Sequence, residues 1–511
     1  MHKKIALLLV TASFAGTAFS FGQAELAGES LNLSVNFYNC PTTRLSYSFL
    51  QNLSRSVSSK TKIVFPGSSE YTKALHHWSE TAQVQSAALV QPINSEDLSN
   101  IITLASYYNV DFAVSSGGHN NDGASSTKGL LIDLSRFNKI LLSNDKKTVS
   151  VGAGLRWGAV YDHLAAPNIS LVGGRVSSVG VGGFTLGGGY GWKTGKYGLA
   201  ADNIIKAEMV LANGRIVTVS PTENADLYFG LRGGGGQFGV VTNFVFKALP
   251  QENQVFSGFY FYSKEQVEVV AETMEKWVAA NKDEKANIML IFAKPPPSYD
   301  PIPVLLVWYD GPASVGKAAF KAFQDLHPLD DTTADMSFAT GNTLQDGLVT
   351  DGDRKTMSSV AWETITRNKI LEAYKFYVKF TTTVPNAAQS SILIEPVFSG
   401  SFRGIRDEEA AYPHKKVLHV IGLVPRWTAS NQDSLIKQWM KKGTALLRAQ
   451  ERNNIVYPNY SIYDEPLVNM FGRNLYKLTT IKAKYDPRCI FRHGFVFPTQ
   501  SCRRCPTAAS W

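Results

Sequence analysis

One stretch of twelve residues constrains the fold more than any other part of the chain. It reads Gly180-Val181-Gly182-Gly183-Phe184-Thr185-Leu186-Gly187-Gly188-Gly189-Tyr190-Gly191 and contains seven glycines. Because glycine has no Cβ, backbone so rich in it can lie directly against a large flat or charged ligand. Backbone N–H groups in such loops also form anion-binding concavities. The same glycines are compatible with tight turns in a β-rich domain, so this stretch alone leaves both interpretations open.

A second fragment ends in the first candidate ligand-binding side chain. The apolar run Phe112-Ala113-Val114 predicts a strand, and the pair Gly117-Gly118 that follows it ends that strand. His119 stands directly after the pair. A single histidine is most often structural or on the surface, but its place inside the glycine-rich region favours contact or a bond with a ligand.

Size, charge and cysteine content exclude several classes of function. The chain has 511 residues, 44% of them hydrophobic, which is ample for a buried core. The net charge is +9, but the 51 basic residues are scattered, which argues against nucleic-acid binding. Cys502 and Cys505 form a CxxC pair with no second pair or nearby histidines, so no metal site is expected. A disulfide within this tail, or two free thiols, is expected instead.

The N-terminus predicts a secreted protein. Residues 1–20 combine His2-Lys3-Lys4 with the apolar run Ile5–Phe14, the pattern of a cleaved signal peptide. This run is shorter than the ~20 residues that a membrane-spanning helix needs, and no later stretch qualifies. An uncleaved anchor is the alternative. Four N-x-S/T sequons fit passage through a glycosylating pathway, at Asn32, Asn52, Asn168 and Asn459.

Hydrophobic periodicity predicts an α+β chain in two domains. Up to Pro250 it indicates a helix from about 95 to 108, which Asn94 or Ser95 can cap, and another over 155–164, with strands over 112–114, 130–134, 148–151, 204–211, 215–219 and 240–246. Asn213-Gly214 predicts that the strands over 204–211 and 215–219 form a hairpin. After Pro250 it indicates helices from a capping box at 263–266 and over 313–326 and 433–448, with strands over 287–293, 302–309, 392–398 and 417–424. Residues 21–80 show no strong period.

Two familiar nucleotide-binding motifs are excluded by their surroundings. Gly234, Gly236 and Gly239 match GxGxxG, but the β-like run Val240–Phe244 follows where a dinucleotide-binding fold needs a helix. Gly195-Lys196 is followed by tyrosine, so it is not a phosphate-binding Walker loop.

Seven short motifs occur together in one order along the chain. They are Val114 to His119, Gly152 to Gly154, Val179 to Gly183, Gly187 to Gly191, Tyr197 to Asn203, Tyr457 to Tyr460 and Lys482 to Pro487. Over roughly residues 80 to 493 this set resembles the berberine bridge enzyme-like oxidases of the vanillyl-alcohol oxidase superfamily, and in texture the fungal secreted members.

The resemblance implies a two-domain PCMH-type FAD-binding fold with an α+β substrate-binding domain. It divides the chain into a signal peptide (1–20), an N-terminal segment (21–80), the FAD domain (81–251), a substrate-binding domain (252–450), a returning berberine-bridge segment (451–493) and an irregular tail (494–511). It implies that FAD is bound covalently through His119. The further cofactor-binding residues that it implies are Gly117, Gly118, Val179, Gly180, Gly182, Gly183, Gly187, Gly188, Gly189, Tyr190, Asp202, Asn203 and Asn459.

The resemblance also names catalytic candidates. Tyr457 would take a proton from the substrate, with His419 as a weaker candidate. A tyrosine has an unperturbed pKa near ~10 and needs help from its surroundings to act as a base. The alternative is that Tyr457 is a buried packing residue.

Departures from the family pattern refine these expectations. Val176 occupies the position of the second linking cysteine, which implies a single covalent bond, and Phe184 replaces a histidine. The glutamate or glutamine carried by relatives on the strand of His419 is absent, which leaves the substrate class open. Val179 stands where a small residue accompanies oxygen use in relatives.

The function expected from the resemblance is oxidation of a small organic substrate, an alcohol, secondary metabolite or sugar. A hydride would pass to the flavin, and O2 would reoxidise it and give H2O2. The expected partners are that substrate and O2, with no nucleic acid and no membrane, in a chain that acts as a monomer. The alternatives are a dehydrogenase with another electron acceptor and a non-catalytic binding protein that retains the fold.

Overall fold

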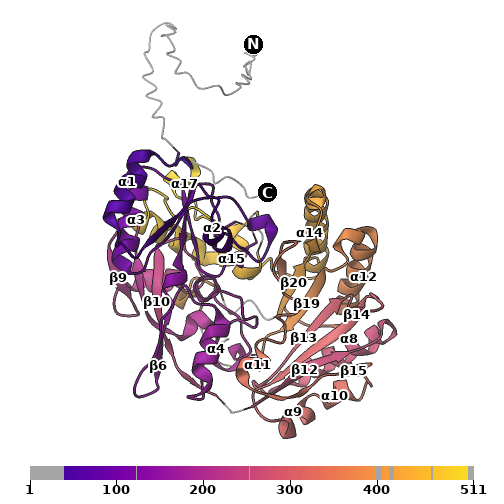
Figure 1. Cartoon of the computed structure of the whole chain (residues 1–511). Helices are drawn as coiled ribbons and strands as arrows, with labels where there is room; N and C mark the ends of the chain where they lie inside the picture. The colour runs from indigo at the N-terminus through magenta and orange to yellow at the C-terminus, as the bar shows by residue number, and fades with distance from the viewer. Residues whose placement is uncertain are drawn as a thin grey trace, which may run out of the picture. The chain divides into compact units, whose positions relative to one another are not determined.

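A computed structural model describes residues 40–121, 123–251, 254–398, 406–413, 419–461 and 464–504. The expected signal peptide, the sequon at Asn32 and the last residues of the tail lie outside these ranges. Most of the described strands form three larger sheets, of four, five and eight strands, with helices packed around them (Figure 1). None of the described helices is long and apolar enough to cross a lipid bilayer.

The four-stranded sheet carries the first candidate loop. Its order is β1-β2-β4-β3, and β2, β4 and β3 run parallel. The helix predicted from about 95 to 108 is confirmed as α3 (Ser95–Tyr107), and the side chain of Asn94 caps it. The strands are β1 (Lys62–Val64), β2 (Ala88–Gln91), β3 (Phe112–Ser115) and β4 (Leu130–Asp133). Because β2 and β4 are buried along their whole length, they read as apolar runs without alternation.

The glycine-rich stretch lies in the connection between two strands of the five-stranded sheet, β6 and β8. Its antiparallel order is β5-β6-β10-β8-β9, and the predicted hairpin at Asn213-Gly214 joins β8 to β9. The strands are β5 (Ile140–Leu142), β6 (Thr148–Gly152), β8 (Ile204–Val210), β9 (Ile216–Val219) and β10 (Val240–Lys247). The predicted helix after β6 is α4 (Trp157–Ala165). The glycine-rich stretch itself contains a short helix, α5 (Val181–Leu186), which the sequence did not indicate.

The eight-stranded antiparallel sheet forms the second half of the fold. Its path is β15-β12-β14-β13-β19-β20-β18, with β16 paired to β12. The strands are β12 (Val255–Phe261), β13 (Ala286–Ala293), β14 (Ile302–Tyr309), β15 (Asp330–Asp331), β16 (Ala334–Met336), β18 (Ser358–Trp362), β19 (Ser391–Pro396) and β20 (His419–Val424).

Both faces of this sheet are buried, each against a different partner. Ile288, Leu290 and Phe292 of β13 join a core with the helices α8 (Val267–Ala280), α12 (Arg367–Thr383) and α14 (Asp433–Arg448). Met289 and Ile291 point to the opposite face. They join the core of the part that contains the four- and five-stranded sheets, here called the glycine-rich domain. The two-residue period of a strand therefore sends alternate side chains to the helices and to the candidate site.

The C-terminal segment packs into the core of the first domain. It contains α15 (Leu467–Phe471) and α16 (Leu475–Tyr485), and its buried side chains include Phe471, Leu478 and Phe491. In Figure 1 this yellow segment lies among the indigo elements of the N-terminal part. Chain ends that are far apart in sequence thus share one core.

Three local expectations are corrected. Cys502 forms a disulfide with Cys489, not with its CxxC neighbour, because the tail runs back beside the end of the 486–491 loop. The expected helix over 313–326 is two pieces, α9 (Ala313–Ala319) and α10 (Lys321–Gln324), interrupted at Phe320. The N-terminal segment, in which the sequence shows no strong period, contains a helix, α1 (Tyr47–Ser56). The side chain of Ser46 caps this helix.

Candidate functional site

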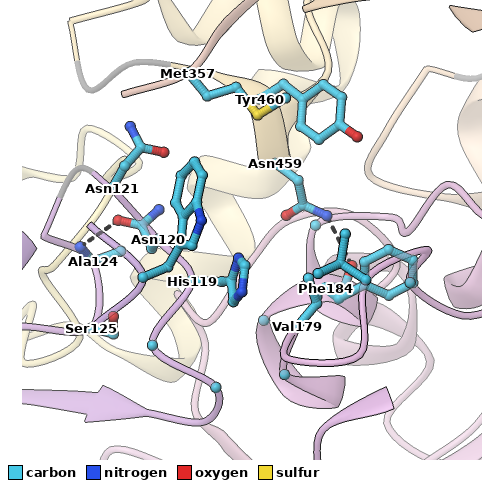
Figure 2. Close-up of a pocket in the computed structure, with 18 of the residues that line it drawn as sticks. His119, Asn120, Asn121, Ala124, Ser125, Val179, Phe184, Met357, Asn459 and Tyr460 are labelled. Carbon is cyan, nitrogen blue, oxygen red and sulfur yellow. Dashed lines mark hydrogen bonds between the residues drawn. The ribbon is translucent and has the colours of Figure 1, made fainter. Parts of the chain in front are cut away.

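A cavity of about 640 Å³ lies between the glycine-rich domain and the eight-stranded sheet. Its walls bring together the loop after β3, the stretch around α5, strands β13 and β19, and the segment that follows Tyr457. Of the predicted site residues, those in the lining are Gly117, Gly118, His119, Val179, Gly180, Gly182, Gly183, Gly187, Tyr190, Tyr457 and Asn459. Figure 2 shows His119, Val179 and Phe184 along one side of this space, with Met357 and Tyr460 opposite.

Two of the glycine fragments meet backbone to backbone. A Cβ added to Gly117 would lie 2.3 Å from the amide nitrogen of Gly180, and one added to Gly180 would lie 2.4 Å from that of Gly117. No side chain fits between these chains without moving one of them. The two predicted motifs are therefore parts of one structure, which brings the loop of His119 beside the N-terminus of α5.

His119 is held as a neutral imidazole. Its Nε2 lies 2.7 Å from the hydroxyl of Ser178, and its ring stacks on that of Trp78 with centroids 5.4 Å apart. Burial, followed by the positive charges of Arg156 and Lys355, lowers the pKa of His119 to about 3. A ring nitrogen therefore keeps its lone pair at neutral pH and can act as a nucleophile or an acceptor.

Tyr457 presents its hydroxyl oxygen to three N–H donors. The backbone N–H groups of Gly189 and Tyr190 lie 3.0 and 3.1 Å away, and Nδ2 of Asn459 lies 2.9 Å away. Burial raises the pKa of Tyr457 to about 12, although these donors act in the opposite direction. Three donors converging on one oxygen are suited to stabilise a phenolate once the proton has left.

Asn459 is locked by the glycine stretch that it faces. Its Nδ2 donates to the carbonyl of Phe184 at 3.0 Å (Figure 2). It also donates to the hydroxyl of Tyr457, so both amide hydrogens are used. A Cβ added to Gly187 would lie 1.8 Å from Oδ1 of Asn459. Glycine at 187 is thus required for this side chain to reach α5.

A buried ion pair on the opposite wall was missed by the sequence analysis. Arg175 forms an ion pair with Glu395 of β19, and Tyr460 accepts from Arg175 at 3.3 Å and donates to Glu395 at 3.4 Å. Burial alone would lower the pKa of Arg175, but the adjacent Glu395 raises it above its usual value. The cavity therefore holds a carboxylate, on the strand next to that of His419.

Five predicted site residues lie outside the cavity wall. They are Gly188, Gly189, Asp202, Asn203 and His419. Asp202 forms an ion pair with Arg232 and accepts from Leu199 N, and Asn203 donates to the carbonyls of Tyr197 and Leu199, so both shape a turn. Nδ1 of His419 accepts from Val397 N between adjacent strands. Their expected roles in catalysis or cofactor contact stay predictions, and in this structure the side chains of Asp202, Asn203 and His419 bond to the protein's own backbone or side chains.

Two family models match the chain at the segments that build this cavity. The model described as FAD binding domain matches residues 86–220, and the one described as berberine and berberine like matches residues 456–494. The chain is 29% identical over 449 residues to the FAD-linked oxidoreductase pgmH of Aspergillus terreus, a match that covers 83% of this chain and 91% of the relative. The chain thus carries an FAD-binding domain and a berberine-like segment, and over most of its length it is similar to an FAD-linked oxidoreductase.

Other proteins resemble the chain over a shorter stretch or at lower sequence identity. The FAD-dependent monooxygenase drtC of Aspergillus calidoustus is 35% identical over 45% of each chain. Among solved structures, BBE-like 1 of Physcomitrella patens superposes with a TM-score of 0.78 at 23% identity, covering 88% of this chain and 99% of the other. The xylooligosaccharide oxidase of Myceliophthora thermophila gives a TM-score of 0.77 at 21% identity, over 88% and 99%. These two likenesses confirm the predicted PCMH-type α+β fold.

The cavity fits FAD. A Cβ added to Gly183 or Gly236 would meet no atom within 4 Å, so both glycines leave open space on the cavity wall. Nε1 of Trp78 is a buried donor without a partner among the described residues, and Trp78 lines the same cavity. A buried unpaired N–H at a ligand cavity is satisfied when a ligand supplies an acceptor. Backbone without side chains at Gly183 and Gly236, together with the unpaired N–H of Trp78, suits a large planar cofactor.

Proposed function

We propose that this protein oxidises a small organic substrate, such as an alcohol, a secondary metabolite or a sugar, and that O2 is its electron acceptor, which yields H2O2. When bound, FAD accepts a hydride from the substrate and passes the electrons on. The single observation that carries the proposal is the cavity itself, in which a glycine-lined wall faces a wall of ionisable side chains.

The chain's own residues supply binding and proton transfer. Tyr457 takes the proton of the substrate hydroxyl as a phenolate, the form of its oxygen that the three N–H donors stabilise, and becomes neutral in that step. Glu395 and Tyr460 orient polar groups of the substrate, and Arg175 neutralises the carboxylate. Met289, Ile291 and Leu393 provide the apolar surface beside them.

A substrate panel tests the proposal directly. Purified yellow protein is mixed anaerobically with alcohols, phenolic metabolites and oligosaccharides, and loss of the flavin absorbance near ~450 nm is followed, since the bound flavin is the redox group. Air is then admitted and peroxide is measured. Bleaching followed by peroxide supports the oxidase, and bleaching without peroxide supports a dehydrogenase. A colourless protein that binds no FAD supports the non-catalytic alternative.

The first prediction concerns attachment of the cofactor. We expect FAD to remain on the protein after acid precipitation, through one bond to His119, because that imidazole is neutral and lines the cavity. Peptide mapping locates the bond. His119→Ala is expected to release all of its flavin on denaturation. Flavin released wholly from the wild type, after expression with ample FAD, would contradict the prediction.

The second prediction concerns oxygen. Val179 lines the cavity and is half-buried, so a longer side chain fills space that O2 needs in a close-packed wall. Val179→Leu is expected to slow reoxidation of the reduced flavin in air-saturated buffer. Val176→Leu adds the same methylene three residues earlier on the same wall and serves as the control. Equal reoxidation rates in wild type and Val179→Leu would favour the dehydrogenase alternative.

The third prediction concerns localisation. We propose that the protein enters the secretory pathway and that its mature chain begins near Phe19 or Phe21. A glycan is expected on Asn168, which is exposed between α4 and the short strand β7 (Ile169–Ser170), and none on Asn459, whose amide is fully used. Glycopeptide analysis decides, with Asn168→Gln as the control. A glycan found on Asn459 would contradict the site described above.

A further inference from the structure

The imidazole of His119 is supported from two sides. The indole of Trp78 stacks against it at an interplanar angle of 10°, and the backbone N–H of Trp78 donates to Gly118 O at 2.9 Å. On the other side, Nε2 meets the hydroxyl of Ser178. No hydrogen-bond partner of Nδ1 occurs among the residues described, so this nitrogen is the one left for a ligand.

The support on the Trp78 side depends on a lysine from the other domain. Nζ of Lys355 donates to the carbonyl of Trp78 at 2.6 Å and lies 4.9 Å from the centroid of its indole ring. Lys355 is only 2% exposed, and it lines the cavity. A desolvated cation over the face of a tryptophan is a strong contact, so Lys355 fixes the plane against which His119 stacks.

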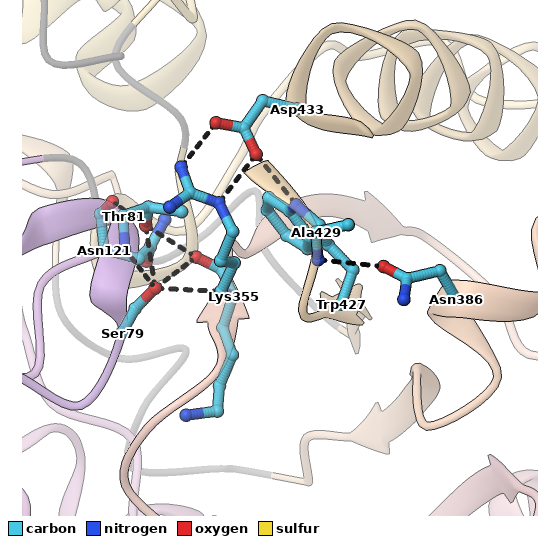
Figure 3. A network of polar contacts seen from close by, with 9 residues as sticks. Ser79, Thr81, Asn121, Lys355, Asn386, Trp427, Ala429 and Asp433 are labelled. Carbon is cyan, nitrogen blue, oxygen red and sulfur yellow. Dashed lines mark hydrogen bonds and ion pairs between the residues drawn. The ribbon is translucent and has the colours of Figure 1, made fainter. Parts of the chain in front are cut away.

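Lys355 is itself clamped between the two domains by the strand β17 (Arg354–Lys355). Its backbone N–H donates to Ser79 Oγ at 2.8 Å, and its carbonyl accepts from Ser79 and Thr81 at 2.7 and 2.9 Å. Arg354 forms an ion pair with Asp433 at the start of α14. Figure 3 shows Ser79, Thr81 and Asn121 on one side of Lys355, and Asp433 and Trp427 on the other.

The Ser178 side of the imidazole is anchored by the same domain. Asp346 accepts from the backbone N–H of Ser177 at 2.9 Å and from its hydroxyl, which fixes the residue preceding Ser178. Both supports of His119 therefore originate within ten residues of each other in the chain, at Asp346 and Lys355.

We propose that Lys355 is the positioning residue for attachment of the flavin, holding His119 through Trp78 in the geometry that the covalent bond requires. This inference rests on the covalent bond proposed above. In the attachment, a ring nitrogen of His119 bonds to the carbon of the flavin methyl group. One C–H bond of that group and the N–H bond of the imidazole break, and the reduced flavin carries the two electrons and two protons until O2 accepts them as H2O2.

The charge of Lys355 should make flavin attachment depend on pH, an effect that the packing of its side chain alone would not produce. The charged or titratable groups that act on His119 are Arg156, Lys355 and His77. Lys355 in turn is surrounded by Arg426, Asp353, Asp351 and Glu80. Burial lowers the pKa of Lys355 itself to about 8, so its ammonium is charged at pH 5.5 and about half deprotonated at pH 8. A variant without this charge should therefore lose more attachment at pH 5.5, where the wild type carries the full charge, than at pH 8.

The test measures attachment rather than turnover. Full-length chain produced with little riboflavin is incubated with FAD at pH 5.5 and pH 8, and acid-stable, in-gel fluorescent flavin is followed over time. We expect Lys355→Met to attach FAD about 10- to 100-fold more slowly, the order expected when a reacting atom is misplaced, with the larger loss at pH 5.5. Lys355→Arg keeps the charge at both pH values and should restore attachment at pH 5.5.

Controls separate this inference from the proposal beneath it. Lys369→Met removes another buried lysine, which contacts the ring of Trp362 away from the cavity, and should attach FAD at the wild-type rate. If Lys355→Met does not fold, Ser79→Ala decides, since it loosens the clamp without touching Nζ. Wild-type attachment by the Lys355→Met or Ser79→Ala variant would overturn the inference. Absence of covalent flavin in the wild type would instead overturn the proposed bond itself.

Discussion

Tyr457→Phe is expected to slow reduction of the flavin by substrate about 10²- to 10⁴-fold, the usual contribution of a general base. The variant removes only the hydroxyl that three N–H donors surround. Binding of substrate should change far less, because the ring remains. Stopped-flow absorbance under anaerobic conditions gives the reduction rate constant and the substrate dissociation constant separately.

Two further variants show whether the lost hydroxyl acted as a base. Tyr412→Phe removes another buried hydroxyl from the same aromatic cluster, but Tyr412 does not line the cavity, so its reduction rate should stay close to that of wild type. Tyr460→Phe tests the competing hydroxyl beside Glu395. An unchanged rate in Tyr457→Phe, with a large loss in Tyr460→Phe, would move the base to the Tyr460–Glu395 pair.

Lys482→Met is expected to lower the free energy of unfolding by about 3 to 5 kcal/mol, the cost of leaving one partner of a buried ion pair uncompensated. Lys482 and Asp486 have side chains with 0% exposure, and they pair at 2.8 Å one helical turn apart. Nζ of Lys482 also donates to the carbonyl of Gln237 at 2.8 Å and to that of Phe491. The same change should weaken retention of FAD, because Gln237 and Phe491 both line the cavity.

The chain contains a matched control two residues away. Lys484 belongs to the same motif but is 60% exposed and pairs with Asp226 at the surface. Exposed ion pairs contribute little to stability, so Lys484→Met should unfold at nearly the urea concentration of wild type. Urea unfolding followed by circular dichroism compares the two variants. Equal destabilisation by both would show that the buried pair has no special role.

Local chemistry was readable from the sequence. The hairpin at Asn213-Gly214, the cap at Asn94 and the strand before Gly117 depend on neighbours in the chain, and all three formed as expected. The order of the motifs indicated the family and FAD. Contacts between distant residues were not readable. Arg175 and Glu395 are 220 residues apart, and no pattern links them.

Motif membership did not tell which residues line the cavity. Asp202 and Asn203 belong to a motif that resembles the family, yet their side chains close a turn. His419 was placed in the site by its strand, but a strand sends alternate side chains to opposite faces, and the neighbouring strand supplies Glu395 instead. The residues of a sequence motif can be required for the shape of the backbone as well as for contact with a cofactor.

The sequence by itself determined the α+β fold class, the glycine-rich backbone that lines the cavity and the place of His119 beside that backbone. These features could be read because glycine spacing and apolar periodicity act within a few residues of backbone. Only the tertiary structure decided which side chains meet across the cavity. Tyr457 finds its donors at Gly189 and Tyr190, and Lys355 finds Trp78, only after strands and loops separated by more than 260 residues have packed. Such contacts depend on register and layer packing, which the order of residues does not display.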